Sequence, residues 1–121
     1  MYSKRHAVAL TTDADGDATG YTPVVNGRVL RVEYVKSDFA DGVDVDVTLE
    51  SSGVVVWDED NVNASKTICP REAVHGTDGA AASYADGYPR EEPIVVAAER
   101  VKIVVASGGD TKSGTFYVTV G

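Results

Sequence analysis

The chain has 121 residues, a formal net charge of −8 and a sequence pI near 4.5. This length suits one domain with an ordinary hydrophobic core, and the acidic balance argues against nucleic acid and anionic membranes as partners, because both require a basic surface. The single cysteine excludes an intrachain disulfide, and no apolar run reaches the roughly 18 residues of a membrane-spanning helix.

Valine is the main apolar residue, with 21 copies against three each of leucine and isoleucine. Its branched side chain restricts χ1 and favours strands. The 12 glycines, together with frequent Asp, Asn and Ser, supply the residues that turns need. Composition therefore predicts an all-β chain, and residues 1–121 are expected to form a single β domain.

The first ten residues, MYSKRHAVAL, contain neither a long apolar core nor a small-residue cleavage site, so we interpret them as mature sequence. Residues 1–5 are expected to form a basic N-terminal arm, either frayed or bound to a partner. From residue 6 the apolar pattern alternates as in a strand. Asp15-Gly16 then marks a hairpin turn into a return strand at residues 18–22.

Asn26-Gly27 is a second turn signal, and it precedes a strand predicted over residues 28–36. The clearest strand signal of the chain follows at residues 43–50, where valines and leucine alternate with polar residues. This pattern predicts one dry face and one solvated, acidic face. Residues 54–57 form a short continuous apolar run, which favours a central strand covered on both faces.

A strand at residues 65–69 is halted by Pro70, and residues 71–92 form the longest stretch without periodicity, apart from a weak helical turn at residues 80–85. Loops of this length in compact domains are usually functional or mobile. The loop is expected to cross between two sheets.

Three further strands complete the chain, at residues 93–98, 100–106 and 115–120. About eight short strands separated by turns predict an antiparallel β-sandwich or a small β-barrel.

Three aspartates, Asp13, Asp15 and Asp17, resemble the start of a calcium loop. An EF-hand loop requires glycine at its sixth position and glutamate at its twelfth, but this chain has Ala18 and Val24 there. We therefore favour a turn, with a weak cation site as the alternative.

The other polar residues form no catalytic constellation. Asp44 and Asp46 are neighbours on the solvated strand face, whereas a glycosidase needs two carboxylates across a cleft. His6 and His75 are too few for a zinc site, and Cys69 is interpreted as a small buried hydrophobe. The sequence thus predicts a protein that is not an enzyme, with no catalytic, cofactor-binding or metal-binding residues and no cofactor.

Trp57 is followed by three acids at residues 58–60. Such a tryptophan more often belongs to a core or an interface than to a sugar site. An exposed cluster of Trp57, Tyr84 and Tyr88 would instead indicate a carbohydrate-binding β-sandwich module.

Four strings of the sequence, taken in order, carry a resemblance over nearly the whole chain: SKRHAVALTTDADGDATGYTPVVNGRVL, YVKSDFADGVDVDVTLE, VWDEDNVNASKTICPREAVH and ERVKIVVASGGDTKSGTFYVTVG. The set resembles small virion structural proteins encoded among the head and neck genes of tailed bacteriophages and prophages. The resemblance implies a non-enzymatic capsid decoration (cement) protein on the outside of the head. A head–tail neck or collar component is the first alternative, and the carbohydrate-binding module is the second.

The same resemblance implies the major capsid protein or neighbouring virion proteins as partners, a homo-oligomer, and a place in the virion after assembly in the host cytoplasm. The charge contrast of the N-terminal arm and the length of the 71–92 loop point to these two segments as the interface. Tyr and Arg are favoured contact residues. The predicted interface residues are Ser3, Lys4, Arg5, His6, Tyr84, Tyr88, Pro89 and Arg90.

Overall fold

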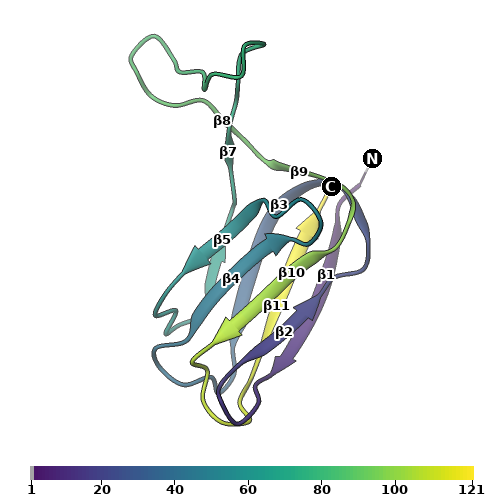
Figure 1. The fold of residues 1–121 in the computed structure, drawn as a ribbon, viewed down its shortest axis with the longest axis vertical. Helices are drawn as coiled ribbons and strands as arrows, with labels where there is room; N and C mark the ends of the chain where they lie inside the picture. Colours follow the sequence, from purple (N-terminus) through teal and green to yellow (C-terminus); the bar gives the residue numbers. More distant parts are fainter. Residues whose placement is uncertain (1) are drawn as a thin grey trace.

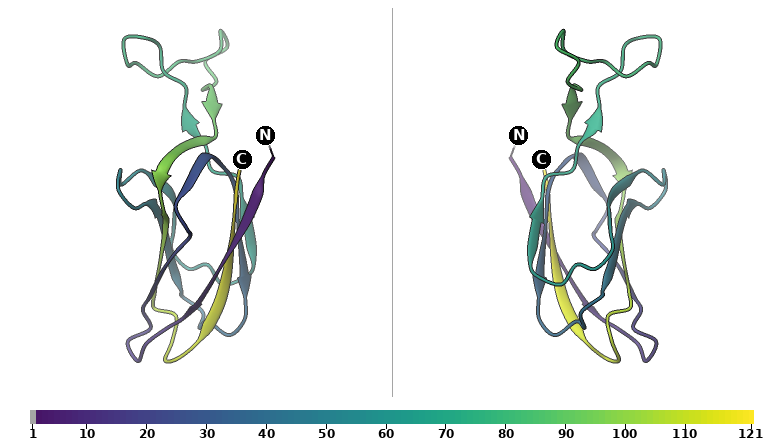
Figure 2. Two further views of the ribbon diagram at one scale, coloured as in Figure 1. Left: turned by 90° about the vertical axis from the view of Figure 1, so that its right-hand side faces the viewer. Right: turned by 90° about the vertical axis from the view of Figure 1, so that its left-hand side faces the viewer.

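The computed structural model describes residues 2–121, and all its regular elements are β-strands. Two antiparallel sheets face each other as the two layers of a β-sandwich (Figures 1 and 2). The all-β prediction is therefore confirmed. The first sheet contains β1 (Lys4–Thr11), β11 (Ser113–Val120), β3 (Val25–Lys36), β6 (Lys66–Ile68) and β9 (Ile94–Glu99). The second contains β2 (Ala18–Tyr21), β10 (Val101–Ala106), β4 (Asp44–Leu49) and β5 (Val55–Glu59).

The core lies between the sheets and is built from the alternating apolar positions that the sequence shows. Val45, Val47 and Leu49 of β4 are almost completely buried, whereas Asp46 between them is exposed and Thr48 is half-buried. Aromatic rings fill the centre of this core. Phe116 of β11 stacks on Tyr34, with ring centroids 5.0 Å apart. In β4 the strand period alone therefore predicts which side chains point inward.

The Asp15-Gly16 turn forms, with Gly16 at a φ of 85°, but it does not join paired strands. β1 pairs along its whole length with β11, from Lys4 opposite Val120 to Thr11 opposite Ser113. β2 pairs instead with β10. The predicted hairpin is thus wrong, because the turn carries the chain from one sheet to the other. A turn signal shows where the chain reverses, whereas the pairing partner depends on strands distant in sequence.

The Asn26-Gly27 signal is also not a turn, because both residues lie inside β3. Gly27 has a φ of 123°, and the register of β3 against β9 shifts between Val25 and Gly27. The glycine therefore forms a β-bulge in a strand that begins three residues earlier than predicted. A second irregularity falls opposite the end of β11 and leaves Leu30 out of the pairing, so that Val29 is buried in its place.

The strand predicted to be central, at residues 54–57, is an edge strand. β5 pairs only with β4, and Val55 is 57% exposed. A short apolar run does not reveal whether a strand is covered on both sides, so this prediction failed. Trp57 is only 7% exposed and lies edge-on to Phe116, at 6.4 Å between ring centroids, so it is a core residue. Cys69, in contrast, is exposed rather than buried.

The strands that flank the 71–92 segment lie in the same sheet, although they were expected in opposite sheets. β6 and β9 both run antiparallel to β3 and occupy the same side of it, with Ile68 opposite Val32 and Ile94 opposite Val29. Only two residues of β3 separate these positions. Residues 69–93 therefore interrupt what would otherwise be one continuous strand beside β3, and they leave and re-enter the sheet at almost the same point.

Candidate interaction surface

The interruption forms a projecting arm, which we define as residues 71–92. It extends from one end of the sandwich, at the same end as the two termini (Figures 1 and 2). At its base β7 (Glu72–Ala73) pairs with β8 (Glu91–Glu92). No residue of the arm is buried. The arm therefore adds nothing to the core and presents its side chains to solvent.

Backbone hydrogen bonds give the arm a branched structure of two short hairpins. Three of these bonds form a closed ring where the hairpins meet the base. The N–H of Val74 donates to the carbonyl of Arg90 at 3.0 Å, that of Ala82 to Val74 at 2.7 Å, and that of Arg90 to Ala82 at 3.2 Å. The three residues are spaced by eight positions. The weak helical turn expected at residues 80–85 is absent from this part of the chain, since those residues belong to the hairpins.

The two hairpin turns repeat one design, which the sequence analysis did not detect. In the second, the N–H of Tyr84 donates to the carbonyl of Tyr88, and the N–H of Gly87 donates to the carbonyl of Tyr84. The side chain of Asp86 accepts a further bond from the N–H of Tyr88 at 3.1 Å. Gly87 has a φ of 88°, which only glycine adopts without strain. The same bonds recur eight residues earlier, where Gly76, Asp78, Gly79 and Ala80 take the equivalent positions.

The second hairpin brings together the four interface residues predicted in this segment. Tyr84 is 56% exposed and Tyr88 is 70% exposed. The guanidinium group of Arg90 lies over the ring of Tyr84, 4.9 Å from its centroid. Pro89 pairs with Ser83 across the hairpin. The hairpin thus holds two aromatic side chains in a defined frame before any partner binds, which lowers the ordering cost of a contact.

The predicted N-terminal arm continues into β1 after Ser3. Met1 lies outside the described residues, Ser3 precedes β1, and Lys4, Arg5 and His6 belong to β1, paired with the end of β11. Charged residues are common on edge strands, so a basic composition does not by itself indicate an unpaired arm. Strand alternation then separates the three side chains. Arg5 lies over the ring of Tyr117 at 4.4 Å, whereas Lys4 and His6 point to the opposite side.

Lys4 and His6 help to line a pocket of about 270 Å³, which we call the terminal pocket. The apolar part of its wall comes mainly from three valines and one tyrosine. Its full lining is Tyr2, Lys4, His6, Val24, Val25, Asn26, Val120 and Gly121. The pocket therefore combines an apolar wall with two basic side chains from β1.

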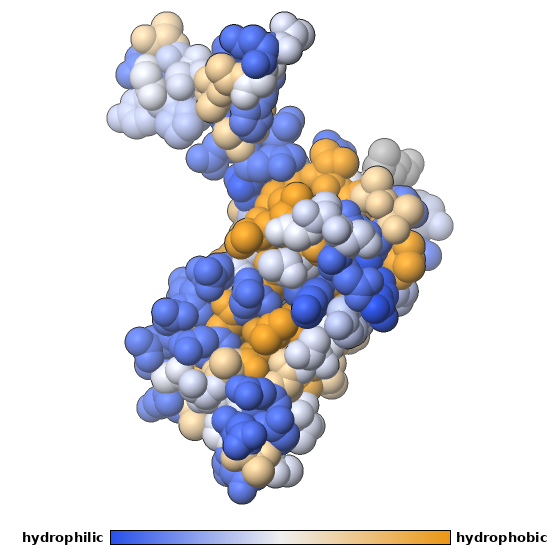
Figure 3. All heavy atoms as spheres, in the orientation of Figure 1, coloured by the Kyte–Doolittle hydropathy of each residue, from blue (hydrophilic) through white to orange (hydrophobic). Residues whose placement is uncertain are grey.

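Apolar surface also gathers on the body near the base of the arm (Figure 3). Val55 of β5 and Val95 of β9 are both more than half exposed. Most of the remaining visible surface of the body is hydrophilic (Figure 3). Large contiguous apolar patches mark contacts with other proteins, whereas single exposed apolar side chains are ordinary.

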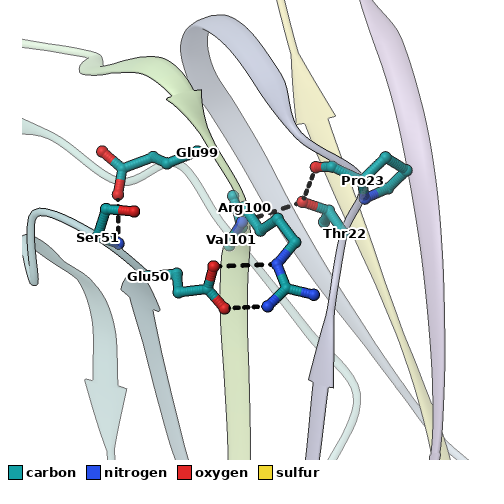
Figure 4. Close-up of polar contacts among 7 residues, drawn as sticks. All are labelled: Thr22, Pro23, Glu50, Ser51, Glu99, Arg100 and Val101. Atoms are coloured by element: carbon teal, nitrogen blue, oxygen red, sulfur yellow. Dashed lines mark hydrogen bonds and ion pairs between the residues drawn. The ribbon is translucent and has the colours of Figure 1, made fainter.

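Polar contacts fix the corner where the arm's return strand passes from one sheet to the other (Figure 4). β9 ends at Glu99 and β10 begins at Val101. The Glu99 carboxylate accepts bonds from the N–H groups of Ser52, at 2.9 Å, and Ser51, at 2.8 Å. These bonds hold the pKa of Glu99 below its ordinary value, although partial burial opposes them. The corner therefore anchors β9, the strand through which the arm re-enters the body.

An ion pair extends the same corner across the second sheet. The guanidinium of Arg100 binds the carboxylate of Glu50, with Nε 3.0 Å from Oε1. It also lies over the ring of Tyr21 at 4.0 Å. Nearby, the hydroxyl of Thr22 accepts a bond from the N–H of Val101 at 3.0 Å. These contacts are explained by the fold and contain no unsatisfied group for a ligand.

The aspartates that resemble the start of a calcium loop form a hydrogen-bonded turn. The carboxylate of Asp13 accepts bonds from the N–H groups of Asp15, at 2.9 Å, and Asp17, at 3.0 Å, as the turn interpretation requires. Among residues 2–121, no group of three His, Cys, Asp or Glu residues is arranged to hold a metal ion. That part of the chain also contains no helix long and apolar enough to cross a membrane.

The exposed aromatic cluster that would mark a sugar-binding module does not form. Trp57 is buried in the sandwich, and its ring N–H donates to Glu59 at 3.2 Å. Lys66 also donates to that carboxylate, and these hydrogen bonds, with the bond from Lys66 the larger effect, lower the pKa of Glu59. Tyr84 and Tyr88 lie on the arm, apart from this tryptophan.

No family model matches the chain, and no curated protein matches it. Among solved structures, it is similar to the C-terminal CBM6 of LamC, a marine laminarinase of Zobellia galactanivorans, with a TM-score of 0.53 and 8% identity over 99% of this chain and 100% of that chain. It also matches the virus-like particle of the extra small virus of the giant freshwater prawn Macrobrachium rosenbergii, with a TM-score of 0.38 and 10% identity over 98% of this chain and 78% of that chain. At such identities the first likeness shows the β-sandwich fold alone.

Proposed function

We propose that the protein is a non-enzymatic structural protein of tailed-phage virions and that it decorates the outside of the head, bound to the major capsid protein. The observation that carries this proposal is the projecting arm. It interrupts one strand of the sandwich, contributes no buried residue, and holds Tyr84 and Tyr88 in an ordered hairpin. An ordered arm with exposed aromatic residues suits a contact with a neighbouring protein.

The resemblance of the sequence to phage head and neck proteins supplies the class of partner. Repeated positions on a capsid allow many weak contacts to retain a small protein. The arm and the apolar surface at its base would then bind the shell, and the acidic body would face solvent in the finished virion. Assembly in the host cytoplasm suits a chain whose single cysteine is exposed and unpaired.

A neck or collar component would use the same arm against a portal or tail protein, so the choice of partner separates the two roles. The carbohydrate-binding alternative is supported by the fold likeness to a CBM6, which extends only to the sandwich. The burial of Trp57 removes the aromatic platform expected for it. A glycan array tests this alternative directly, because a decoration protein should bind capsids and no sugar.

The test compares occupancy on capsids assembled from the major capsid protein encoded beside the gene. Two interfacial tyrosines truncated to alanine typically cost a few kcal/mol together, which corresponds to a loss of roughly tenfold or more in affinity. We therefore expect Y84A/Y88A to lose occupancy at least tenfold. The matched control is Y21A, which removes an exposed tyrosine from β2 of the body.

Equal occupancy of Y84A/Y88A and the wild-type protein would overturn the assignment of the arm. Binding of the wild-type protein to portal or tail assemblies but not to capsids would place it in the neck.

A further inference from the structure

The terminal pocket and the second hairpin of the arm are complementary in size. At about 270 Å³ the pocket is slightly smaller than sites for drug-sized ligands, which start near about 300 Å³. Its volume therefore suits a single large side chain. Tyr88 stands at the end of the second hairpin and is the more exposed of the two arm tyrosines, at 70%. Its ring is apolar and its hydroxyl is polar. The pocket wall offers valines to the ring and polar side chains to the hydroxyl.

The two surfaces are also complementary in charge. Lys4 brings a positive charge to the pocket wall, whereas the turn that carries Tyr88 has the exposed carboxylate of Asp86 at its tip. The only nearby cation of this hairpin, Arg90, lies back at its base over the ring of Tyr84. A tyrosine beside a carboxylate thus faces outward from the arm, and a pocket with basic side chains lies open at the same end of the body.

The arm cannot fill this pocket within its own chain in the observed structure, because it projects away from the body (Figures 1 and 2). Each copy therefore carries one hairpin to insert and one pocket to receive. Contacts between two different surfaces are heterologous, and they generate rings or chains of subunits. Such an arrangement suits a protein that occupies neighbouring positions on a lattice.

We propose that the occupant of the terminal pocket is the second hairpin of another copy of this chain, with Tyr88 inserted between the valines and Asp86 beside Lys4 and His6. The proposal rests on the proposed function in treating the arm as a contact element, and it deepens that function by assigning Tyr88 to a contact between neighbouring copies, beside the contacts of the arm with the shell. The contact is small, so its affinity is low in dilute solution and increases where copies are held side by side.

Disulfide cross-linking tests the contact. In the C69S background, which removes the native exposed thiol, Y88C protein is mixed with V24C protein and oxidised. We expect the Y88C–V24C heterodimer to form at least fivefold faster than either homodimer. The matched controls are A80C, the equivalent position on the first hairpin, and V35C, at the opposite end of β3 from the pocket.

Equal cross-linking of V24C to A80C, or of Y88C to V35C, would overturn the proposal. The Y88C/V24C double variant, oxidised at high dilution, provides a further check. An intrachain disulfide would mean that the arm folds back onto its own pocket, which also overturns the proposal.

Charge reversal provides a second measurement. Exposed ion pairs contribute up to about 1 kcal/mol, so D86K or K4E should slow cross-linking about two- to fivefold at low salt. Mixing the D86K hairpin with the K4E pocket should restore the wild-type rate. D78K, which makes the same change on the first hairpin, should have no effect.

If the single reversals leave the rate unchanged, or if D78K slows it equally, the assignment fails. These assays contain no capsid, so failure here leaves the capsid-occupancy test intact. Loss of capsid binding with intact cross-linking would instead refute only the decoration role.

Discussion

Excision of the arm tests the central structural claim, that residues 71–92 are an excursion from one strand. Ile68 and Ile94 lie opposite Val32 and Val29, three residues apart on β3. At about 3.3 Å per residue this separation is roughly 10 Å. Replacement of residues 71–92 by Gly-Ser leaves a connection of five residues between the two strands, which easily spans this distance.

The expected magnitude follows from the contacts that are lost and the loop that is shortened. No residue of the arm is buried, so the core keeps its apolar contacts. The connection shortens from 25 residues (69–93) to five. Loop-closure entropy scales as (3/2)RT ln n, so this fivefold change favours the folded state by about 1.4 kcal/mol. We expect the free energy of unfolding to be unchanged or to increase by about 1 kcal/mol.

Urea denaturation followed by tryptophan fluorescence measures this difference, because the single tryptophan, Trp57, is buried in the core. The excised variant should unfold in one cooperative transition at a urea concentration no lower than that of the wild-type protein. It should also lose capsid occupancy under the proposed function. A loss of more than about 2 kcal/mol would refute the reasoning, since it would show that the arm stabilises the sandwich.

Three further changes test the core and the corner, each by urea or thermal denaturation. F116A should cost about 3–5 kcal/mol, because the ring is fully buried among other aromatic rings. G114A should cost about 1–3 kcal/mol, since its Cβ would collide with the buried ring of Phe39; a neutral result would mean that this ring has room to move. Glu99, whose pKa is lowered chiefly by the N–H of Ser52, should stabilise the fold above its unfolded-state pKa, and this contribution is lost as the pH falls through the lowered folded-state value. E99Q should therefore weaken the decline of Tm between pH 7 and pH 3, and parallel curves for the two proteins would contradict this role.

Much of the candidate surface could be predicted from sequence, but its geometry could not. The arm tyrosines were identified because a long segment without strand or helix periodicity is unusual in a small domain, and this one contains two tyrosines. The repeat of two turns went undetected, since its signal is carried by backbone hydrogen bonds and by only two shared residue types, Asp and Gly. The terminal pocket was not predicted, because it forms where the first residues of β1 and β3 lie beside the last residues of β11.

The sequence by itself determined the class of fold and the inward faces of the strands that keep a regular alternation, such as β4. In β4, for example, Val45, Val47 and Leu49 alternate with polar residues, so only one orientation of the strand removes all three from water. This requirement is local to the strand. The sequence also located most turns, because Asp-Gly pairs favour backbone conformations with positive φ.

Only the tertiary structure decided which strands pair. The eight-residue β1 pairs with the last strand of the chain rather than with its neighbour in sequence. The 12-residue β3 accommodates two short strands end to end on one side. Pairing of this kind depends on strand lengths and bulges across the whole sheet, which no single segment encodes. For that reason the long segment expected to cross between sheets is instead an arm that leaves one strand and returns to it.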